Sequence, residues 1–256
     1  MNPQIPSRIH GFLFDLDGTL FLGDEPYAGA LDTVARLRAA GLRLGFLSNT
    51  TRMSRASAVE RLVRMSFDVK PEEVMTPNLA AAELLQKEGR KKVMLLLTED
   101  TKKDFEGFTE EMETPEVVVV GDLGDGFLPS VLDRAFLALL RGADLLALQK
   151  NRYWRTPQGF RVDVGGYVAL LEFASGKQAR SLGKPAPAFF RAALDRLGLP
   201  PERAAMVGDD VNSDVGAAQK LGLFGVLVRT GKFSETELRK SVVRPDLLLG
   251  SVAELA

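Results

Sequence analysis

The sequence predicts an α/β protein built on a parallel sheet, with a second α/β unit inserted into the first. Three observations indicate this fold class. Short apolar runs alternate with stretches of helical period, polar residues directly follow several of the apolar runs, and the middle of the chain carries strands and helices of its own. Such alternation forms right-handed βαβ units. The 256 residues suffice for one large domain or two modest ones.

The first part of the chain alternates strand and helix. Apolar runs predict buried strands, and apolar side chains recurring every three or four residues predict helices. Gly41 is expected to end the first helix, and Thr51 or Ser54 to cap the second. The expected elements are a strand over 9–14, a helix over 28–40, a strand over 42–47 and a helix over 52–65.

The middle of the chain repeats this alternation and adds a hairpin that turns near Pro157. Because it has its own strands and helices, we expect an inserted α/β domain over 79–178 in a core of residues 1–78 and 179–256. The middle elements are helices over 78–87, 129–141 and 165–174, strands over 92–98, 117–120 and 145–148, and a hairpin over 153–164. The last are a helix over 188–197, a strand over 204–207, a helix ending at Leu221, and strands over 224–228 and 246–249.

Composition excludes several classes of function. The net charge is −1 and no long run of one sign occurs, so we expect no nucleic-acid partner. No stretch approaches the roughly 18 uncharged apolar residues of a membrane span, and the first residues lack an apolar signal core. We therefore expect no membrane partner and a cytoplasmic location. With no cysteine and only His10, any chemistry must use carboxylates, lysine, hydroxyls and a metal.

The stretch that follows the first strand carries the strongest functional signal. Asp15 and Asp17 alternate with apolar residues, so both carboxylates point the same way if the strand continues. Two carboxylates at one strand end repel each other unless a cation lies between them, and a hard ion such as Mg²⁺ suits them. Gly18 allows a tight turn and Thr19 offers a hydroxyl. A plain Asp/Gly turn is the alternative interpretation.

Three further polar clusters follow predicted strands or precede helices. They are Ser48-Asn49, Lys184, and Asp209/Asp210/Asp214. Ligands of open parallel sheets bind beyond the carboxyl ends of the strands, so all four clusters are expected to share one crevice. Taken singly, Ser48 fits a helix cap, Lys184 a surface lysine, and Asp214 a charge at a helix N-terminus.

The four clusters, in this order, resemble the motifs of the haloacid dehalogenase (HAD) superfamily of phosphohydrolases. The resemblance implies a Rossmann-like parallel-sheet HAD core, and the insert resembles the large α/β cap of the NagD-like branch. Ser48-Asn49-Thr50-Thr51, Gly183-Lys184-Pro185 and Arg229-Thr230-Gly231-Lys232-Phe233 are most similar to the phospholysine/phosphohistidine/inorganic pyrophosphate phosphatase group. Some members of that group lack the second catalytic aspartate, whereas this chain has Asp17.

The resemblance implies a role for each cluster. Asp15 attacks phosphorus and forms an aspartyl-phosphate, and Asp17 acts as general acid and base. Mg²⁺ is held by Asp15, the Asp17 carbonyl and Asp209, with Asp214 in support. Ser48, Asn49 and Lys184 bind the phosphoryl oxygens, while Gly18, Thr19 and Asp210 are supporting residues.

The inserted cap is expected to read the leaving group of a small phosphorylated metabolite and to exclude water. A homodimer formed through the cap is a further expectation. The cap residues proposed for the leaving group are Lys150, Asn151, Arg152, Tyr153, Asp163 and Tyr167.

Other functions compete with a phosphatase. A phospho-accepting signalling module also combines strand-end aspartates, Mg²⁺, a hydroxyl and a lysine, but it needs neither Asp17 nor an insert. A ligand-binding protein without turnover has the same fold class. A dehalogenase needs no acid/base aspartate and no metal, and a P-loop enzyme is disfavoured because no G-x(4)-G-K-[ST] occurs.

Overall fold

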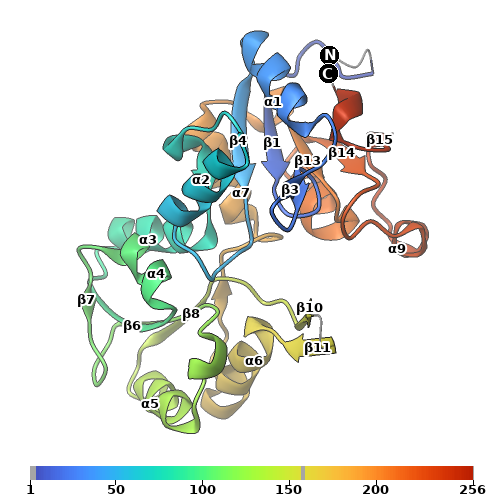
Figure 1. Ribbon diagram of the computed structural model, residues 1–256. Helices are drawn as coiled ribbons and strands as arrows, with labels where there is room; N and C mark the ends of the chain where they lie inside the picture. Colours follow the sequence, from blue (N-terminus) through green and yellow to red (C-terminus); the bar gives the residue numbers. More distant parts are fainter. Residues whose placement is uncertain (1–3, 157–158, 256) are drawn as a thin grey trace. The chain divides into compact units, whose positions relative to one another are not determined.

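The computed structural model of the chain describes residues 4–156 and 159–255, which form two compact units. Unit 1 comprises the residues up to Ser48, Ala58–Met75 and the residues from Lys184 onward; unit 2 comprises Asn49–Ser57 and Thr76–Gly183 (Figure 1). Residues 49–57, 76–78 and 179–183 were expected in the core but group with unit 2. Hydrogen bonds to distant residues of unit 2 account for the first segment, since the Ser54 N–H donates to Asp100 Oδ2 at 2.8 Å.

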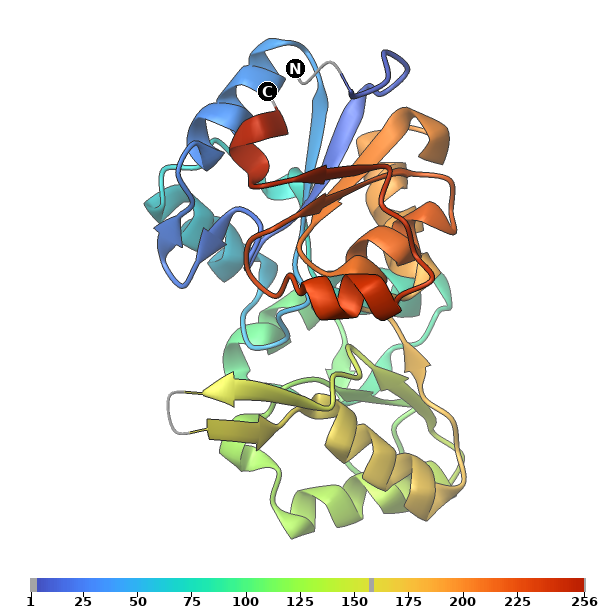
Figure 2. The same cartoon turned by 90° about the vertical axis from the view of Figure 1, so that its right-hand side faces the viewer.

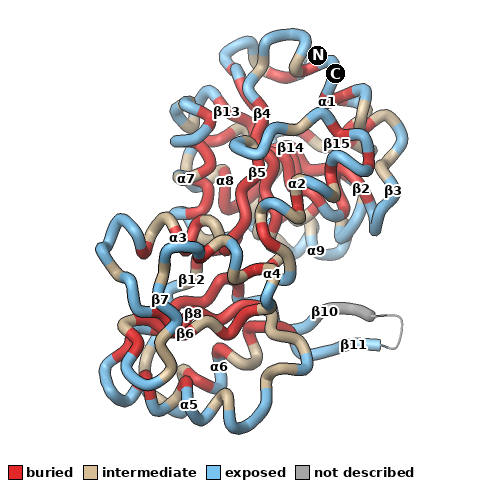
Figure 3. Tube along the Cα trace, turned by 60° about the vertical axis from the view of Figure 1, so that its left-hand side comes forward, coloured by how far each residue is buried: buried red, intermediate tan, exposed pale blue. Residues whose placement is uncertain are grey.

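A six-stranded parallel sheet forms the centre of unit 1, in the order β15-β14-β13-β1-β4-β5. Every residue of the central strand β1 is buried, including those on both faces of the strand. The neighbouring strands β4 and β5 are likewise mostly buried, drawn red in Figure 3. Phe14 stacks between Phe12 and Phe46, with ring centroids 6.0 Å apart in both pairs. A strand buried on both faces explains why its sequence is continuously apolar. The strands are β1 (Gly11–Asp15), β4 (Arg43–Leu47), β5 (Val74–Met75), β13 (Ala204–Gly208), β14 (Phe224–Val228) and β15 (Leu247–Leu249).

The helices of unit 1 begin and end where their capping residues predict. Gly41 adopts a left-handed φ of 77° after the first helix, and its N–H donates to the Arg38 carbonyl. Ser54 caps the second helix, because its hydroxyl oxygen accepts from the Ser57 N–H at 3.2 Å. The helices are α1 (Ala30–Ala39), α2 (Arg55–Arg64), α7 (Pro187–Leu197), a π-helical turn (Val211–Gly216), α8 (Ala217–Gln219) and α9 (Glu235–Lys240). Short 3-10 turns cover Pro71–Glu73, Pro201–Arg203 and Val252–Leu255.

Unit 2 contains its own five-stranded parallel sheet, in the order β12-β9-β8-β6-β7. The four valines of β8 are all buried, and α5 and α6 pack against apolar residues of this sheet. The strands are β6 (Lys92–Leu96), β7 (Thr109–Glu110), β8 (Val117–Val120), β9 (Asp144–Ala147) and β12 (Arg180–Ser181). The helices are α3 (Pro77–Lys87), α4 (Glu99–Lys102), α5 (Pro129–Leu140) and α6 (Val164–Ser175), with 3-10 turns over Lys103–Phe105 and Gly124–Gly126.

The predicted hairpin of unit 2 is present as the antiparallel strands β10 (Tyr153–Thr156) and β11 (Gly159–Val162), yellow in Figure 2. Its expected turn at Pro157 and Gln158 lies outside the described residues. The predicted parallel α/β class is confirmed, while several short elements were not foreseen. These are β2 (Phe21–Leu22), β3 (Glu25–Pro26), β7, α4, β12 and α9. Across the described residues, no helix combines the length and the apolar character that spanning a membrane demands.

Candidate active site

Polar residues end three neighbouring strands of the unit 1 sheet at the same edge. Asp15 is the last residue of β1, Ser48 directly follows β4, and Asp209 directly follows β13. Their exposed fractions are only 7%, 4% and 3%. Because burying a carboxylate is costly even when it is paired, the aspartates at this strand edge indicate a purpose other than folding. The chain order reverses around β1, which is where ligands of open α/β sheets bind.

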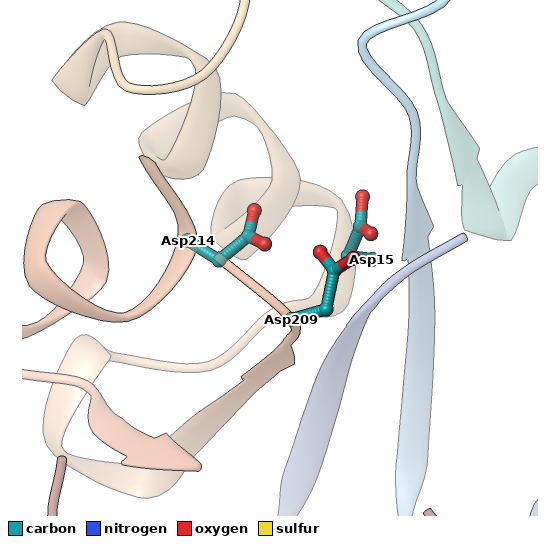
Figure 4. A group of neighbouring side chains, drawn as sticks. All are labelled: Asp15, Asp209 and Asp214. Atoms are coloured by element: carbon teal, nitrogen blue, oxygen red, sulfur yellow. The ribbon is translucent and has the colours of Figure 1, made fainter. Parts of the chain in front are cut away.

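Three aspartates converge at this edge. Oxygen atoms of Asp15, Asp209 and Asp214 all lie within 4.8 Å of one another. Figure 4 shows the three carboxylates directed toward a common point, from the end of β1, the end of β13 and the following π-helical turn. The sequence predicted all three at the site. The sequence does not show how close the Asp214 carboxylate lies to the other two; the tertiary structure brings it there.

Lys184 lies between two of these aspartates. Its ammonium forms ion pairs with Asp15 Oδ1 and with Asp214 Oδ1, the latter at 2.7 Å. Burial favours the neutral amine, but the charges of Asp15 and Asp214 outweigh it and raise the pKa of Lys184. The lysine therefore stays protonated. It is a buried cation at the strand edge, and the surface-lysine interpretation is wrong.

The charges of the cluster fit a divalent cation. When all three carboxyls are ionised, they face one ammonium and leave an excess of two negative charges; burial opposes that charge and raises the pKa of Asp214 to about 7. The pKa of Asp209 is raised to about 6, first by burial and then by the Asp15 charge. A cation bound beside Asp209 would oppose both effects and favour the ionised carboxylate. Oxygen ligands and an unmatched charge of two are what a hard ion such as Mg²⁺ requires, so Asp15 and Asp209 fit as its ligands.

Asp17 occupies a more open position than Asp15. Its side chain is 53% exposed, and Oδ1 lies 3.8 Å from the guanidinium of Arg61. Its pKa is nevertheless raised, mainly because the carboxyl has lost part of its hydration, with the Asp15 charge adding to the effect and Arg61 opposing it. A carboxyl with a raised pKa and access to solvent is suited to exchange protons with a reacting group.

Gly18 and Thr19 shape the turn after β1. Gly18 has a φ of 92°, a left-handed conformation in which any other residue would be strained. The buried Thr19 hydroxyl donates to Asp15 Oδ2 at 3.3 Å. Thr19 therefore acts on the position of Asp15, while Gly18 allows the close approach of Asp209.

Asp210 serves as a helix cap. Its Oδ1 accepts hydrogen bonds from the N–H groups of Asn212 and Ser213, both at 2.9 Å. Burial acts to raise the pKa of Asp210, but these hydrogen bonds dominate and lower it. Asp214 accepts from the Asp210 N–H at 3.2 Å. Asp210 thus fixes the turn that carries Asp214.

The remaining predicted residues belong to unit 2. The Asn49 side chain packs against Gly183, at the carboxyl end of the unit. Lys150 pairs with Glu172 at 2.9 Å, and Tyr153 packs edge-on against Phe160. Asn151 and Arg152 are exposed. None of these five borders the pocket described next.

Asp163 and Tyr167 border a cavity of about 290 Å³ in unit 2. Asp163 caps α6, accepting from the Val164 N–H and the Gln149 amide, both at 2.7 Å. Tyr167 stacks on Phe127 with ring centroids 3.7 Å apart. The charged side chains around the cavity include Arg52, Asp122, Asp125 and Arg161. Of the six predicted cap residues, Asp163 and Tyr167 line this cavity and the other four do not.

Sequence reasoning missed two contributions to the site in unit 1. Arg61 of α2 donates to Asp24 and to the Gly23 carbonyl, and so connects the β2–β3 hairpin to Asp17. The Lys232 N–H donates to Asp209 Oδ2 at 2.6 Å. The sequence does not predict this contact of residues 229–233, because a main-chain donor leaves no signal in the sequence.

Comparisons with known proteins define the class. The profile of the family described as Haloacid dehalogenase-like hydrolase matches residues 12–109, and a second HAD hydrolase profile matches residues 181–255. The chain is 37% identical to the phospholysine phosphohistidine inorganic pyrophosphate phosphatase of Rattus norvegicus, over 97% of this chain and 93% of the relative. It is 39% identical to the human haloacid dehalogenase-like hydrolase domain-containing protein 2, over 89% and 87%. The chain belongs to the haloacid dehalogenase-like hydrolases.

Solved structures narrow the class to one branch. The 4-nitrophenylphosphatase of Thermotoga maritima superposes with a TM-score of 0.90 at 30% identity, covering 97% of this chain and 96% of that one. NagD of Escherichia coli K-12 superposes with a TM-score of 0.89 at 26% identity, covering 97% and 98%. The protein is a NagD-like HAD phosphatase, a phosphoric monoester hydrolase, as the motifs predicted.

Proposed function

We propose that this phosphatase hydrolyses a small phosphorylated metabolite through a phosphoenzyme formed on Asp15, with Mg²⁺ bound at the strand edge. The observation that carries the proposal is the buried Asp15 carboxylate, held by Lys184 and Thr19 and within reach of Asp209. A carboxylate fixed in this way is a positioned nucleophile.

The reaction proceeds in two displacements. An Asp15 oxygen forms a bond to phosphorus while the bond from phosphorus to the leaving oxygen breaks, and Asp17 gives its proton to that oxygen. Asp17 then accepts a proton from water as the water oxygen attacks phosphorus, which frees phosphate and restores Asp15. The raised pKa and partial exposure of Asp17 support this exchange.

Asp15, the Asp17 main-chain carbonyl and Asp209 would hold Mg²⁺, and Asp214 would orient Lys184. When bound, the ion neutralises phosphoryl oxygens that otherwise repel a carboxylate nucleophile. Ser48, Asn49 and Lys184 would bind the transferred phosphoryl group, Lys184 as a charge already present in the site.

The cavity of unit 2 supports a role for Asp163 and Tyr167 in reading the leaving group. Its volume of about 290 Å³ and its mixture of charged and aromatic walls suit a small polar metabolite. The rat relative is named for phospholysine, phosphohistidine and inorganic pyrophosphate. We propose a compact substrate of similar size.

A homodimer formed through unit 2 is part of the proposal. The outward faces of α5 and α6 expose Leu137, Leu140, Leu170 and Phe173, the last at 92%. Exposed apolar side chains on neighbouring helices are typical of protein contacts. A cytoplasmic location stays a prediction of the sequence.

The decisive experiment is an assay of the purified chain on p-nitrophenyl phosphate and a panel of phosphorylated metabolites, with Mg²⁺ or with EDTA. Phosphate release that requires Mg²⁺, together with acid-stable trapping of ³²P on Asp15, is the expected result. A stable phosphoenzyme without release would instead indicate a phospho-accepting module. Mg²⁺ binding with neither labelling nor release would indicate a binding protein.

A further inference from the structure

The loop after β14 contacts the turn after β1. The Thr230 hydroxyl donates to the Gly18 carbonyl at 2.6 Å, across a sequence separation of 212 residues. The Gly231 N–H donates to the Tyr27 hydroxyl at 3.2 Å. With the Lys232 N–H on Asp209, three consecutive residues thus engage three different parts of the site.

Two glycines make this contact close. Gly18 and Gly231 both have left-handed φ angles, of 92° and 56°. A Cβ atom on either residue would overlap Asp209 Oδ2, and one on Gly231 would also overlap Gly18. The two backbones therefore meet where side chains would otherwise stand, and Asp209 Oδ2 lies in the niche between them. Any displacement of the loop would move the Asp209 carboxylate.

The geometry points to a positioning role for Thr230. We propose that residues 230–232 form a clamp, which holds Asp209 and the turn after Asp15 in the relative positions that Mg²⁺ binding needs. The inference rests on the proposed function for the identity of the ion. The Lys232 N–H donates to Asp209 Oδ2, so that Oδ1 would remain available to a metal ion. Thr230 fixes the loop by its bond to Gly18, and Tyr27 supports it from the β2–β3 side.

Hydrogen bonds that orient metal ligands typically change metal affinity or activity by roughly 10–100-fold when removed. Thr230→Val keeps the shape of the side chain but loses the donor. We expect it to raise the Mg²⁺ dissociation constant of the full-length chain about tenfold or more, measured by calorimetry in metal-free buffer. Saturating Mg²⁺ should restore most turnover, because the ligands themselves are intact. Thr230→Ser, which keeps the hydroxyl, should bind Mg²⁺ within about threefold of wild type.

Ser234→Ala is the matched control. Ser234 lies in the same loop and caps α9, with its hydroxyl oxygen 3.3 Å from the Glu237 N–H, so its loss affects stability without touching the clamp. If Thr230→Val does not fold, Tyr27→Phe removes the acceptor of the Gly231 N–H and should weaken Mg²⁺ binding severalfold. Wild-type Mg²⁺ affinity in a folded Thr230→Val or Tyr27→Phe protein overturns the clamp. A wild-type chain that binds Mg²⁺ but hydrolyses no phosphate ester overturns the function and leaves the clamp to be judged by affinity.

Discussion

The chain contains two parallel sheets whose carboxyl edges differ in chemistry. In unit 1 the strand ends carry the buried polar residues Asp15, Ser48 and Asp209. In unit 2 the residues after β6, β8 and β9 are Leu97, Gly121 and Leu148. A Cβ atom on Gly121 would lie 2.6 Å from Leu97 and 2.8 Å from Leu148, so this edge is closed by apolar packing.

The difference shows that the architecture does not set the chemistry. Both sheets bury apolar strands, but in unit 1 buried carboxylates stand directly at the strand ends, and Lys184 offsets part of their charge. Buried carboxylates cost stability unless they are paired or bind a cation. The carboxyl edge of the unit 1 sheet therefore fits a ligand-binding role, whereas the residues that directly follow the strands of unit 2 pack against one another.

The largest expected effect is on turnover. Asp15→Asn removes the nucleophile at the edge of unit 1 while keeping its shape, and should lower p-nitrophenyl phosphate hydrolysis at least about a thousandfold. The matched control is Asp144→Asn, at the amino end of β9 in unit 2, where the half-exposed carboxylate pairs with Arg90. That variant should keep activity within about twofold. Comparable rates in the two variants would remove Asp15 from the mechanism.

The second effect is on stability and should be confined to unit 1. Lys184→Met leaves Asp15 and Asp214 buried without their cation, and removing one partner of a buried ion pair typically costs about 3–5 kcal/mol. Hydrogen exchange should accelerate in β1 and β13 but not in β8. Adding Asp214→Asn should recover part of the loss. Equal acceleration in both sheets would show that the pair does not stabilise unit 1 specifically.

The third effect concerns pH. Asp209 has a pKa of about 6 without metal, so protons compete with Mg²⁺ below that value. Since a carboxyl with a raised pKa is protonated as pH falls through that pKa, Mg²⁺ affinity should fall about tenfold between pH 7 and pH 5, with proton release on binding at the lower pH. Calorimetry in buffers of different ionisation enthalpy measures both. Affinity independent of pH in this range would mean that Asp209 is not a ligand.

The smallest expected effects come from adding one methyl group near the carboxyl edge of each sheet. Gly121→Ala in unit 2 would bring a methyl group against the ends of two leucine side chains and, at 3.4 Å, Thr51 Cβ, and should cost about 1 kcal/mol, with Mg²⁺ affinity unchanged. Gly208→Ala in unit 1 meets the Asp214 side chain, and should weaken turnover severalfold by displacing it. Thermal melts and Mg²⁺ titrations of both variants provide the comparison. A loss of Mg²⁺ affinity in Gly121→Ala would contradict the separation.

Much of the fold followed from local sequence. Strands β8 and β14 were predicted with the bounds observed, and the end of α1 followed from Gly41, which has a left-handed conformation. Short elements such as α4 and β2 were missed because they lack an apolar period. Residues 49–57 were assigned to the core because nothing in their sequence reveals hydrogen bonds to Asp100 and Asp104.

The sequence by itself determined which residues end the strands of unit 1, because apolar runs and the polar residues after them are local patterns. Only the tertiary structure decided how those residues meet. Lys184 pairs with Asp15 across 169 residues, and Thr230 contacts Gly18 across 212. Such contacts depend on strand order and on main-chain donors, neither of which the sequence displays.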